Sequence, residues 1–231
     1  MISINSLDID VKLIGEGGNS RVYLLEREYK GMTSAAIKVP KAFADYRVPQ
    51  ALANYQIIKQ IGVKTTAFLD KCLFDGVQSL ITENLHHKDY TYLDANSHLH
   101  TKNDNLLRLL ETDCGLECSD KEPEEERFFA DDKFELITNF DEFVESHLLL
   151  LRKVSDEHIY LAYDCYFFKV KRDKKTDIDY VIADWDDVQI CEDDDLFENN
   201  KDQFKMALLQ FVDRFVEDKI TEKYYNYLKQ L

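Results

Sequence analysis

The placement of glycine is the feature of this sequence that most restricts its fold. The chain has 231 residues but only seven glycines, and three of them, Gly15, Gly17 and Gly18, fall in one short segment. No glycine follows Gly115. Glycine allows positive φ and close approach to the backbone. The concentration at 15–20 therefore predicts a turn with a special local role.

The segments around this turn predict strands. Residues 9–14 alternate apolar and polar side chains, as a half-buried strand does. Residues 21–28 are rich in aliphatic and aromatic side chains, and residues 35–39 form an apolar run that ends at Pro40. Short links join the three segments, which predicts an antiparallel three-stranded meander.

A helix and a second hairpin are predicted next. Residues 48–61 carry apolar side chains at helical spacing. The dipeptide Asp75-Gly76 separates two apolar runs, 67–74 and 77–84, which is a strong signal for a tight hairpin. The order over the first 84 residues is thus strand, strand, strand, helix, strand, strand.

The second half of the chain predicts more helix. Residues 139–152 have a helical pattern that Asn139 or Asp141 would cap. Residues 165–171 and 178–184 read as two strands joined by a charged turn. Two further helices are expected in the tail, at 200–217 and 219–230.

The charge of the chain limits its partners. Lys and Arg number 29 and Asp and Glu number 45, for a net charge of −16. This balance argues against a protein that tracks a nucleic-acid backbone, which needs a basic stripe. It is compatible with a single bound nucleotide, because a few local donors and a metal suffice there. The acidic segment 119–132 is predicted to be a solvated or disordered insert.

No segment is apolar for long enough to predict a membrane-spanning helix. The first residues lack the basic flank and apolar core of a secretory signal. The five cysteines are an odd number, which favours reduced thiols. We expect a cytoplasmic protein, and export by a specialised system without a cleavable signal would also fit.

Two motifs in the N-terminal half resemble those of protein kinases. The segment Leu13–Tyr23 resembles the glycine-rich loop, and Ala36-Ile37-Lys38 on the following strand resembles the Val-Ala-Ile-Lys motif. In that family both elements bind the phosphates of ATP. The resemblance implies this role for Gly15, Gly17, Gly18, Ser20 and Lys38.

Two aspartates in the C-terminal half complete the resemblance. Ile182-Ala183-Asp184 followed by Trp185 resembles the magnesium-binding Asp-Phe-Gly motif, in the form found in aminoglycoside and other small-molecule kinases. Asp164 directly precedes a predicted strand, where the family has its second metal ligand. The resemblance implies that Asp164 and Asp184 are catalytic and bind Mg²⁺, a cation that prefers oxygen ligands.

The resemblance covers almost the whole chain. It implies an α+β, two-lobed protein-kinase-like fold with an N-lobe at 1–83, built from a five-stranded sheet and one helix. A reduced, mainly helical C-lobe would follow at 84–231. The hinge would be Glu83-Asn84-Leu85, where backbone groups, including those of Glu83 and Leu85, would bind the adenine of the nucleotide.

The sequence also departs from the family. No Glu occurs between Glu28 and Glu83 to pair with Lys38, so an amide, Asn54 or Gln50, would take that place. Asp45, ahead of the helix, is a further candidate.

The catalytic loop departs as well. If Asp164 is the metal ligand, the position of the catalytic base falls on Ile159. The nearby proton acceptors Asp156, Glu157 and His158 lack the family spacing, and no Ala-Pro-Glu motif follows Asp184.

We therefore expect an ATP- and Mg²⁺-dependent phosphotransferase, foremost a divergent Ser/Thr protein kinase with a protein substrate. The alternatives are a pseudokinase that acts as a scaffold for a protein partner, and a kinase-fold enzyme with another transfer activity. Such an activity would be small-molecule phosphorylation or adenylylation.

Overall fold

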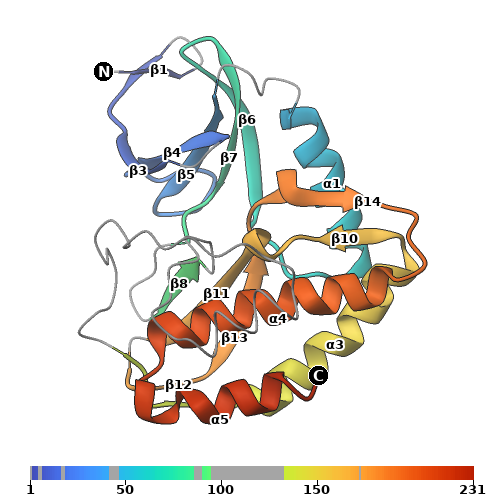
Figure 1. Cartoon of the computed structure of the whole chain (residues 1–231). Helices are drawn as coiled ribbons and strands as arrows, with labels where there is room; N and C mark the ends of the chain where they lie inside the picture. Colours follow the sequence, from blue (N-terminus) through green and yellow to red (C-terminus); the bar gives the residue numbers. More distant parts are fainter. Residues whose placement is uncertain are drawn as a thin grey trace. The chain divides into compact units, whose positions relative to one another are not determined.

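A computed structural model describes residues 2–4, 7–16, 19–41, 47–85, 90–94, 133–171 and 173–231. The chain divides into two compact units, Met1–His87 and Lys88–Leu231 (Figure 1). We describe each unit by itself. The assignment of N-lobe and C-lobe at 83/84 stays a prediction.

Unit 1 is built on one antiparallel sheet with the strand order β2-β1-β6-β7-β5-β4-β3. Its strands are β1 (Ile2–Ile4), β2 (Leu7–Ile9), β3 (Lys12–Glu16), β4 (Ser20–Leu25), β5 (Ala35–Pro40), β6 (Phe68–Phe74) and β7 (Val77–Glu83). The five predicted strands are confirmed as β3 to β7. The hairpin β1–β2, which the sequence pattern did not predict, extends the sheet beyond β6.

The topology forces this sheet to curl. Strands β2 and β3 form its two edges, yet only Asp10 and Val11 separate them along the chain. Two residues span only about 10 Å, so the edges come close together at that end. Figure 1 shows the resulting curved sheet.

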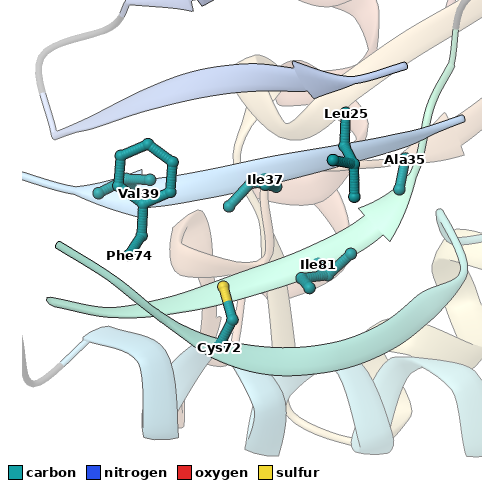
Figure 2. Close-up of a cluster of buried hydrophobic side chains, with 7 residues drawn as sticks. All are labelled: Leu25, Ala35, Ile37, Val39, Cys72, Phe74 and Ile81. Atoms are coloured by element: carbon teal, nitrogen blue, oxygen red, sulfur yellow. The ribbon is translucent and has the colours of Figure 1, made fainter. Parts of the chain in front are cut away.

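The core of unit 1 lies on one face of the curled sheet. Figure 2 shows its buried side chains on four strands: Leu25, Ala35, Ile37, Val39, Cys72, Phe74 and Ile81. The rings of Tyr23 and Phe74 pack at 4.6 Å between centroids. Because side chains alternate along a strand, the residues between these core positions face the opposite side of the sheet.

The predicted hairpin at Asp75-Gly76 is confirmed. Asp75 and Gly76 have φ of 47° and 83°, and Phe74 pairs with Val77 on either side of them. Two consecutive positive φ angles define the type I′ turn, whose twist matches that of the strands.

The described residues of unit 2 form three helices and several short strands. The helices are α3 (Phe140–Asp156), α4 (Leu196–Phe215) and α5 (Asp218–Leu228). Helix α4 is buried on all sides from Phe204 to Val212. It packs against both other helices as well as against β10 (Ile159–Leu161) and β11 (Tyr166–Lys171). This helix is therefore the central element of the unit.

The main sheet of unit 2 has the order β13-β11-β8. The two predicted strands are confirmed as β11 and β13 (Ile178–Ile182), paired antiparallel, and β8 (Tyr90–Asp94) adds a third strand. Two smaller pairs accompany it: β10 with β14 (Val188–Ile190), and β9 (Leu136–Ile137) with β12 (Lys175–Thr176).

Asn139 precedes α3, but its side chain makes no capping bond to the helix. Its amide instead donates to the carbonyl of Ile178 at 2.9 Å and accepts from the Ile178 amide at 2.8 Å. The predicted capping role of Asn139 is thus wrong, because the side chain acts as a strand partner that ties α3 to the start of β13.

The acidic segment predicted to be an insert, 119–132, lies outside the described residues. Among the residues that are described, no helix is both long enough and apolar enough to cross a membrane.

We predict that Ile37→Ala destabilises the protein strongly. Ile37 is fully buried in the unit 1 core, so truncation leaves a cavity and should cost about 2–5 kcal/mol of unfolding free energy. Ile14→Ala is the matched control, because Ile14 is 46% exposed and should cost less than about 1 kcal/mol. Chemical denaturation measures both, and equal losses would contradict this placement of the core.

Candidate functional site

The turn within the glycine-rich segment is shorter than the sequence pattern predicts. Gly15 lies within β3 and Ser20 begins β4, with Gly15 paired to Val22. Gly17 and Gly18 lie outside the described residues. The prediction that the turn covers 15–20 is thus wrong at both ends, because cross-strand pairing continues through Glu16 and Arg21.

The base of this turn is held by charged side chains. Glu16 accepts from Lys41 Nζ at 2.9 Å and from Arg21 Nε at 3.1 Å. These two bonds, Lys41 first, lower the pKa of Glu16. The Lys41 amide also donates to the carbonyl of Asn19 at 2.8 Å. The ends of β3 and β4 are thereby tied to the end of β5.

Gly15 is not required by the packing of the chain itself. A Cβ built at this position would lie 3.8 Å from Val22 Cβ, an ordinary van der Waals contact. Its backbone also lies outside the positive-φ region, unlike Gly31, Gly62 and Gly76. The described structure therefore leaves space above β3 at Gly15.

Lys38 occupies the face of the sheet opposite the core. It lies on β5 between Ile37 and Val39, which point into the core, and it is itself half-buried. It pairs with Val22 on β4 and with Leu80 on β7, so one row of residues runs across the sheet from Gly15 to Leu80. A strand lysine among apolar neighbours is costly to bury unless it meets an anion or a polar partner.

Helix α1 (Arg47–Ile61) covers the same face of the sheet as Lys38. The ring of Tyr55 lies 6.0 Å from that of Phe68. Phe68 pairs with Thr82, and Thr82 pairs with Ala36, two residues before Lys38. Since paired residues share a face, α1 and Lys38 lie on one side of the sheet.

The buried side of α1 carries an amide. Asn54 is buried, and its Oδ1 accepts from Gln50 Nε2 at 2.9 Å, whereas Gln50 itself is exposed. Of the two amides that the sequence offered as substitutes for the family Glu, Asn54 is thus the one on the inner side of the helix. Asp45 lies outside the described residues.

The predicted hinge begins where β7 ends. Glu83 is the last residue of β7, pairs with Ala35, and donates its amide to Ala67 at 2.9 Å. Asn84 donates from its side chain to Ser34 Oγ at 3.0 Å, and Leu85 is partly exposed. The backbone at the start of this segment is therefore fixed by the sheet.

In unit 2, the two predicted aspartates come to one end of one sheet. Strand β11 starts two residues after Asp164, and β13 ends two residues before Asp184. The ladder pairs Tyr166 with Ile182, and the amide of Ala183 donates to the carbonyl of Cys165 at 3.1 Å. Asp164 and Asp184 are the next residues along the chain beyond this last bond, so both lie at the same end of the β11–β13 pair.

Electrostatics agree with this placement. Cys165 is fully buried, and burial raises the pKa of its thiol well above the ordinary value. The carboxylates of Asp164, Asp184 and Asp187 raise it further, in that order. Three acidic side chains thus act on one buried sulfur, and close carboxylates repel each other unless a cation offsets their charge.

Each aspartate is oriented by a short 3₁₀ turn. Tyr163–Cys165 and Trp185–Asp187 form the two turns, and they lie against each other. Asp184 caps the second turn by accepting from the Asp186 amide at 3.4 Å. Trp185 is buried, and its indole donates to the carbonyl of Ile182 at 3.2 Å. The backbone around Asp184 is therefore firmly held.

Carboxylates at neighbouring strand ends are suitable ligands for a hard divalent cation. Within the described residues, however, no group of three or more His, Cys, Asp or Glu side chains is arranged to hold a metal by itself. A cation at Asp164 and Asp184 would need further oxygen ligands from a bound molecule or from water.

The connection from β10 to β11 is only four residues long, Ala162–Cys165. Ile159, where the base position falls, is fully buried within β10. Asp156, Glu157 and His158 are exposed and precede β10, whereas Asp164 follows it. The structure thus does not bring these proton acceptors to the end of β10 that carries Asp164.

Helix α4 holds this short connection through two side chains that sequence reasoning missed. Asn200 accepts from the Leu161 amide at 2.8 Å and donates to the carbonyl of Ile159 at 2.8 Å and to Ser155 Oγ at 3.0 Å. Gln203 accepts from the Tyr163 amide at 3.0 Å. In the sequence, the only sign of this role was the position of an amide residue, Asn200, just before the apolar helical stripe of α4.

Comparison with known proteins gives the following similarities. No protein-family model and no curated protein matches the sequence. Among solved structures, the PknI kinase domain of Mycobacterium tuberculosis is similar at 12% identity, covering 88% of this chain and 72% of that one, with a TM-score of 0.40.

Two aminoglycoside-related structures are similar as well. The streptomycin–ATP–APH(2″)-IIa complex aligns at 11% identity over 96% of this chain and 79% of that one, with a TM-score of 0.37. The GDP and kanamycin complex of APH(2″)-IIia aligns at 13% identity over 96% and 83%, with a TM-score of 0.34.

The fold is α+β and protein-kinase-like in the order of its own elements. Five antiparallel strands with one helix after the third are followed by a mainly helical unit, in which a strand hairpin leads to Asp184. The predicted fold class is confirmed, with β1–β2 and β8 as additions.

We predict that Asn200→Ala destabilises unit 2. Asn200 is fully buried, and its loss leaves the Leu161 amide and the Ile159 carbonyl without their side-chain partner, at about 1–3 kcal/mol for each unsatisfied group. Thermal unfolding measures the effect. Asn226→Ala is the control, because Asn226 is exposed on α5. If both variants unfold alike, Asn200 does not hold the connection.

We further predict selective alkylation of the described cysteines. Burial, with the Asp70 carboxylate, raises the pKa of Cys72 to about 11, and burial also raises the pKa of Cys165. Both thiols are buried, whereas Cys191 is partly exposed. Since the thiolate is the reactive form, iodoacetamide at neutral pH should modify Cys191 well before the other two, as read by peptide mass spectrometry. Rapid modification of Cys165 in folded protein would contradict its burial.

Proposed function

We propose that this protein is an ATP- and Mg²⁺-dependent phosphotransferase, foremost a divergent Ser/Thr protein kinase. One observation carries the proposal: Asp164 and Asp184 both lie directly beyond the last bond of the β11–β13 pair, at one strand end. Such paired carboxylates are stable together when a cation lies at them. The kinase-like order of elements is consistent with this function but does not by itself specify it.

Unit 1 would bind the phosphates of the nucleotide. Lys38 carries a positive charge in an otherwise apolar strand, on the face of the sheet opposite the core, which is also the face that α1 covers. Gly15 lies in the same cross-strand row, at a position where packing leaves space. A glycine that the fold itself does not need supports close approach by a ligand. Gly17, Gly18 and Ser20 would complete the loop, and the backbone of Glu83 and Leu85 would bind the adenine.

Unit 2 would hold the metal. Asp164 and Asp184 would ligate Mg²⁺, which when bound neutralises charge on the phosphates. The chain's own contribution would be to hold the backbone that bears these carboxylates: the bond from Ala183 to Cys165 joins the two residues next to them, and Asn200 and Gln203 bind the connection that bears Asp164. Phosphoryl transfer depends mainly on such positioning and on electrostatics, so a displaced base is tolerable.

A second candidate is a nucleotide-binding pseudokinase that serves as a protein scaffold. It is favoured by the burial of Ile159 at the base position and by the four-residue connection, which leaves little room for a catalytic loop. The amide of Asn54 in place of a carboxylate also fits, because an amide orients Lys38 without neutralising it. Small-molecule phosphorylation and adenylylation remain alternatives for an active enzyme.

The proposal is tested by label transfer. Incubation of the full chain with Mg²⁺ and γ-labelled ATP, with a protein mixture as acceptor, should give labelled protein. Asp184→Asn and Lys38→Met should each reduce transfer by about a hundredfold or more, as expected when an electrostatic contact to the phosphates is lost. Transfer from α-labelled ATP instead would indicate adenylylation.

Two matched variants control for loss of fold. Lys71→Met removes an exposed lysine from the same cross-strand row as Lys38, and Asp194→Asn removes an exposed carboxylate from unit 2. Both should transfer label like the unaltered protein. ATP-dependent thermal stabilisation without transfer, unchanged in Asp184→Asn, would favour the scaffold and overturn the enzyme.

A further inference from the structure

We propose that the surface around the end of β14 docks a basic protein segment, with Ile190 at its centre. This surface, which we call the β14 surface, consists of Gln189, Ile190 and the acidic run Glu192–Asp195. The inference goes beyond phosphoryl transfer and holds equally for an enzyme and for a scaffold.

Ile190 is unusually exposed for a strand residue. It is 64% exposed, although Val188 on the same strand is buried and Ile159, its partner across the ladder, is fully buried. Its aliphatic side chain thus extends past the covered part of the β10–β14 pair. A single exposed apolar side chain is common on protein surfaces, so Ile190 matters here because it stands beside an open strand edge and an acidic run.

The backbone of Ile190 is also open on one side. The amide of Cys191 donates to the carbonyl of His158 at 2.8 Å. Bonded and non-bonded pairs alternate along an antiparallel ladder, so the N–H and C=O of Ile190 point away from β10. Among the described residues the sheet holds only β10 and β14, so this edge of Ile190 is suited to an added extended segment.

The charge of the chain segment that contains Ile190 indicates the kind of partner. Between Thr176 and Asn200 the sequence has no Lys or Arg and ten acidic residues, of which five follow Ile190: Glu192, Asp193, Asp194, Asp195 and Glu198. The run Glu192–Asp195 follows Ile190 almost directly and is fully exposed. Complementary charge steers and selects a partner, so a segment rich in Lys or Arg fits this surface.

Part of the acidic run has a structural role, and the remainder does not. Asp193 accepts from the Asp195 amide at 2.9 Å and from Asn199 Nδ2 at 2.7 Å, which organises the start of α4. Within the described part of the chain, the side chains of Glu192, Asp194 and Asp195 have no hydrogen bond or ion pair. These three carboxylates are therefore available to a partner without loss of an internal contact.

The occupant that satisfies both features is an extended protein segment whose apolar side chain is flanked by lysines or arginines. The apolar side chain would pack on Ile190, and its basic neighbours would face Glu192, Asp194 and Asp195. A purely basic segment without the apolar residue would have only screened surface attraction, which is weak.

The test is direct binding of short synthetic peptides to the full chain, measured by fluorescence anisotropy without nucleotide. A peptide that alternates lysine with valine should bind. A glutamate–valine peptide should not bind, and a lysine–serine peptide should bind about tenfold more weakly. Binding to the Asp184→Asn variant should be unchanged, so failure of this inference and failure of the phosphotransferase proposal are separable.

Substitutions localise the surface. Ile190→Ser and the double change Asp194→Asn with Asp195→Asn should each weaken the lysine–valine peptide by about tenfold. Leu149→Ser, at an apolar residue that is 67% exposed on α3, is the matched control and should have no effect. Circular dichroism and thermal unfolding confirm that each variant is folded.

Several results would overturn the inference. Equal binding by Ile190→Ser, equal binding of the lysine–serine peptide, or no binding of the lysine–valine peptide at low salt would each do so. Hydrogen exchange gives a second reading, since the amide of Ile190, which points away from β10, should be protected on peptide binding.

Discussion

The backbone bond from Ala183 to Cys165 is the interaction on which the candidate chemistry of unit 2 depends. It extends the β11–β13 ladder by one step and thereby places two carboxylates, Asp164 and Asp184, at the same strand end. These carboxylates, with that of Asp187, also raise the pKa of the buried Cys165 thiol. Negative charge therefore gathers at this strand end, which is consistent with a site that meets positive charge there.

Helix α4 explains how the short connection between β10 and β11 is held in place. In a longer loop, internal bonds would be needed to hold each backbone group, but here Asn200 and Gln203 bind the backbone on both sides of Ala162. These bonds come from a helix whose middle is buried on all sides. Buried polar groups that are fully paired make such a contact rigid, so the position of Asp164 follows that of α4.

Much of the fold could be predicted from local sequence patterns, because each of these patterns favours one local backbone conformation. Asp75-Gly76 adopts the type I′ turn that its residue types favour, and the helix predicted from apolar spacing at 48–61 is α1. Predictions failed where a distant partner decided the outcome. Asn139 looks like a cap but bonds to Ile178, which no local pattern reveals. Gly15 looks like part of a turn, but pairing with Val22 keeps it in a strand.

The sequence alone determined the order of the predicted strands and helices, the residue types along them, and the absence of a glutamate between Glu28 and Glu83. These properties are local or compositional, so they need no tertiary contact to be read. Only the tertiary structure decided that Asp164 and Asp184 share one sheet end, that Asn200 binds the backbone of Leu161 before Asp164, and that Ile190 is exposed to water. Each of these depends on pairing and packing between residues far apart in the chain, where burial and register select one arrangement among many that the local pattern allows.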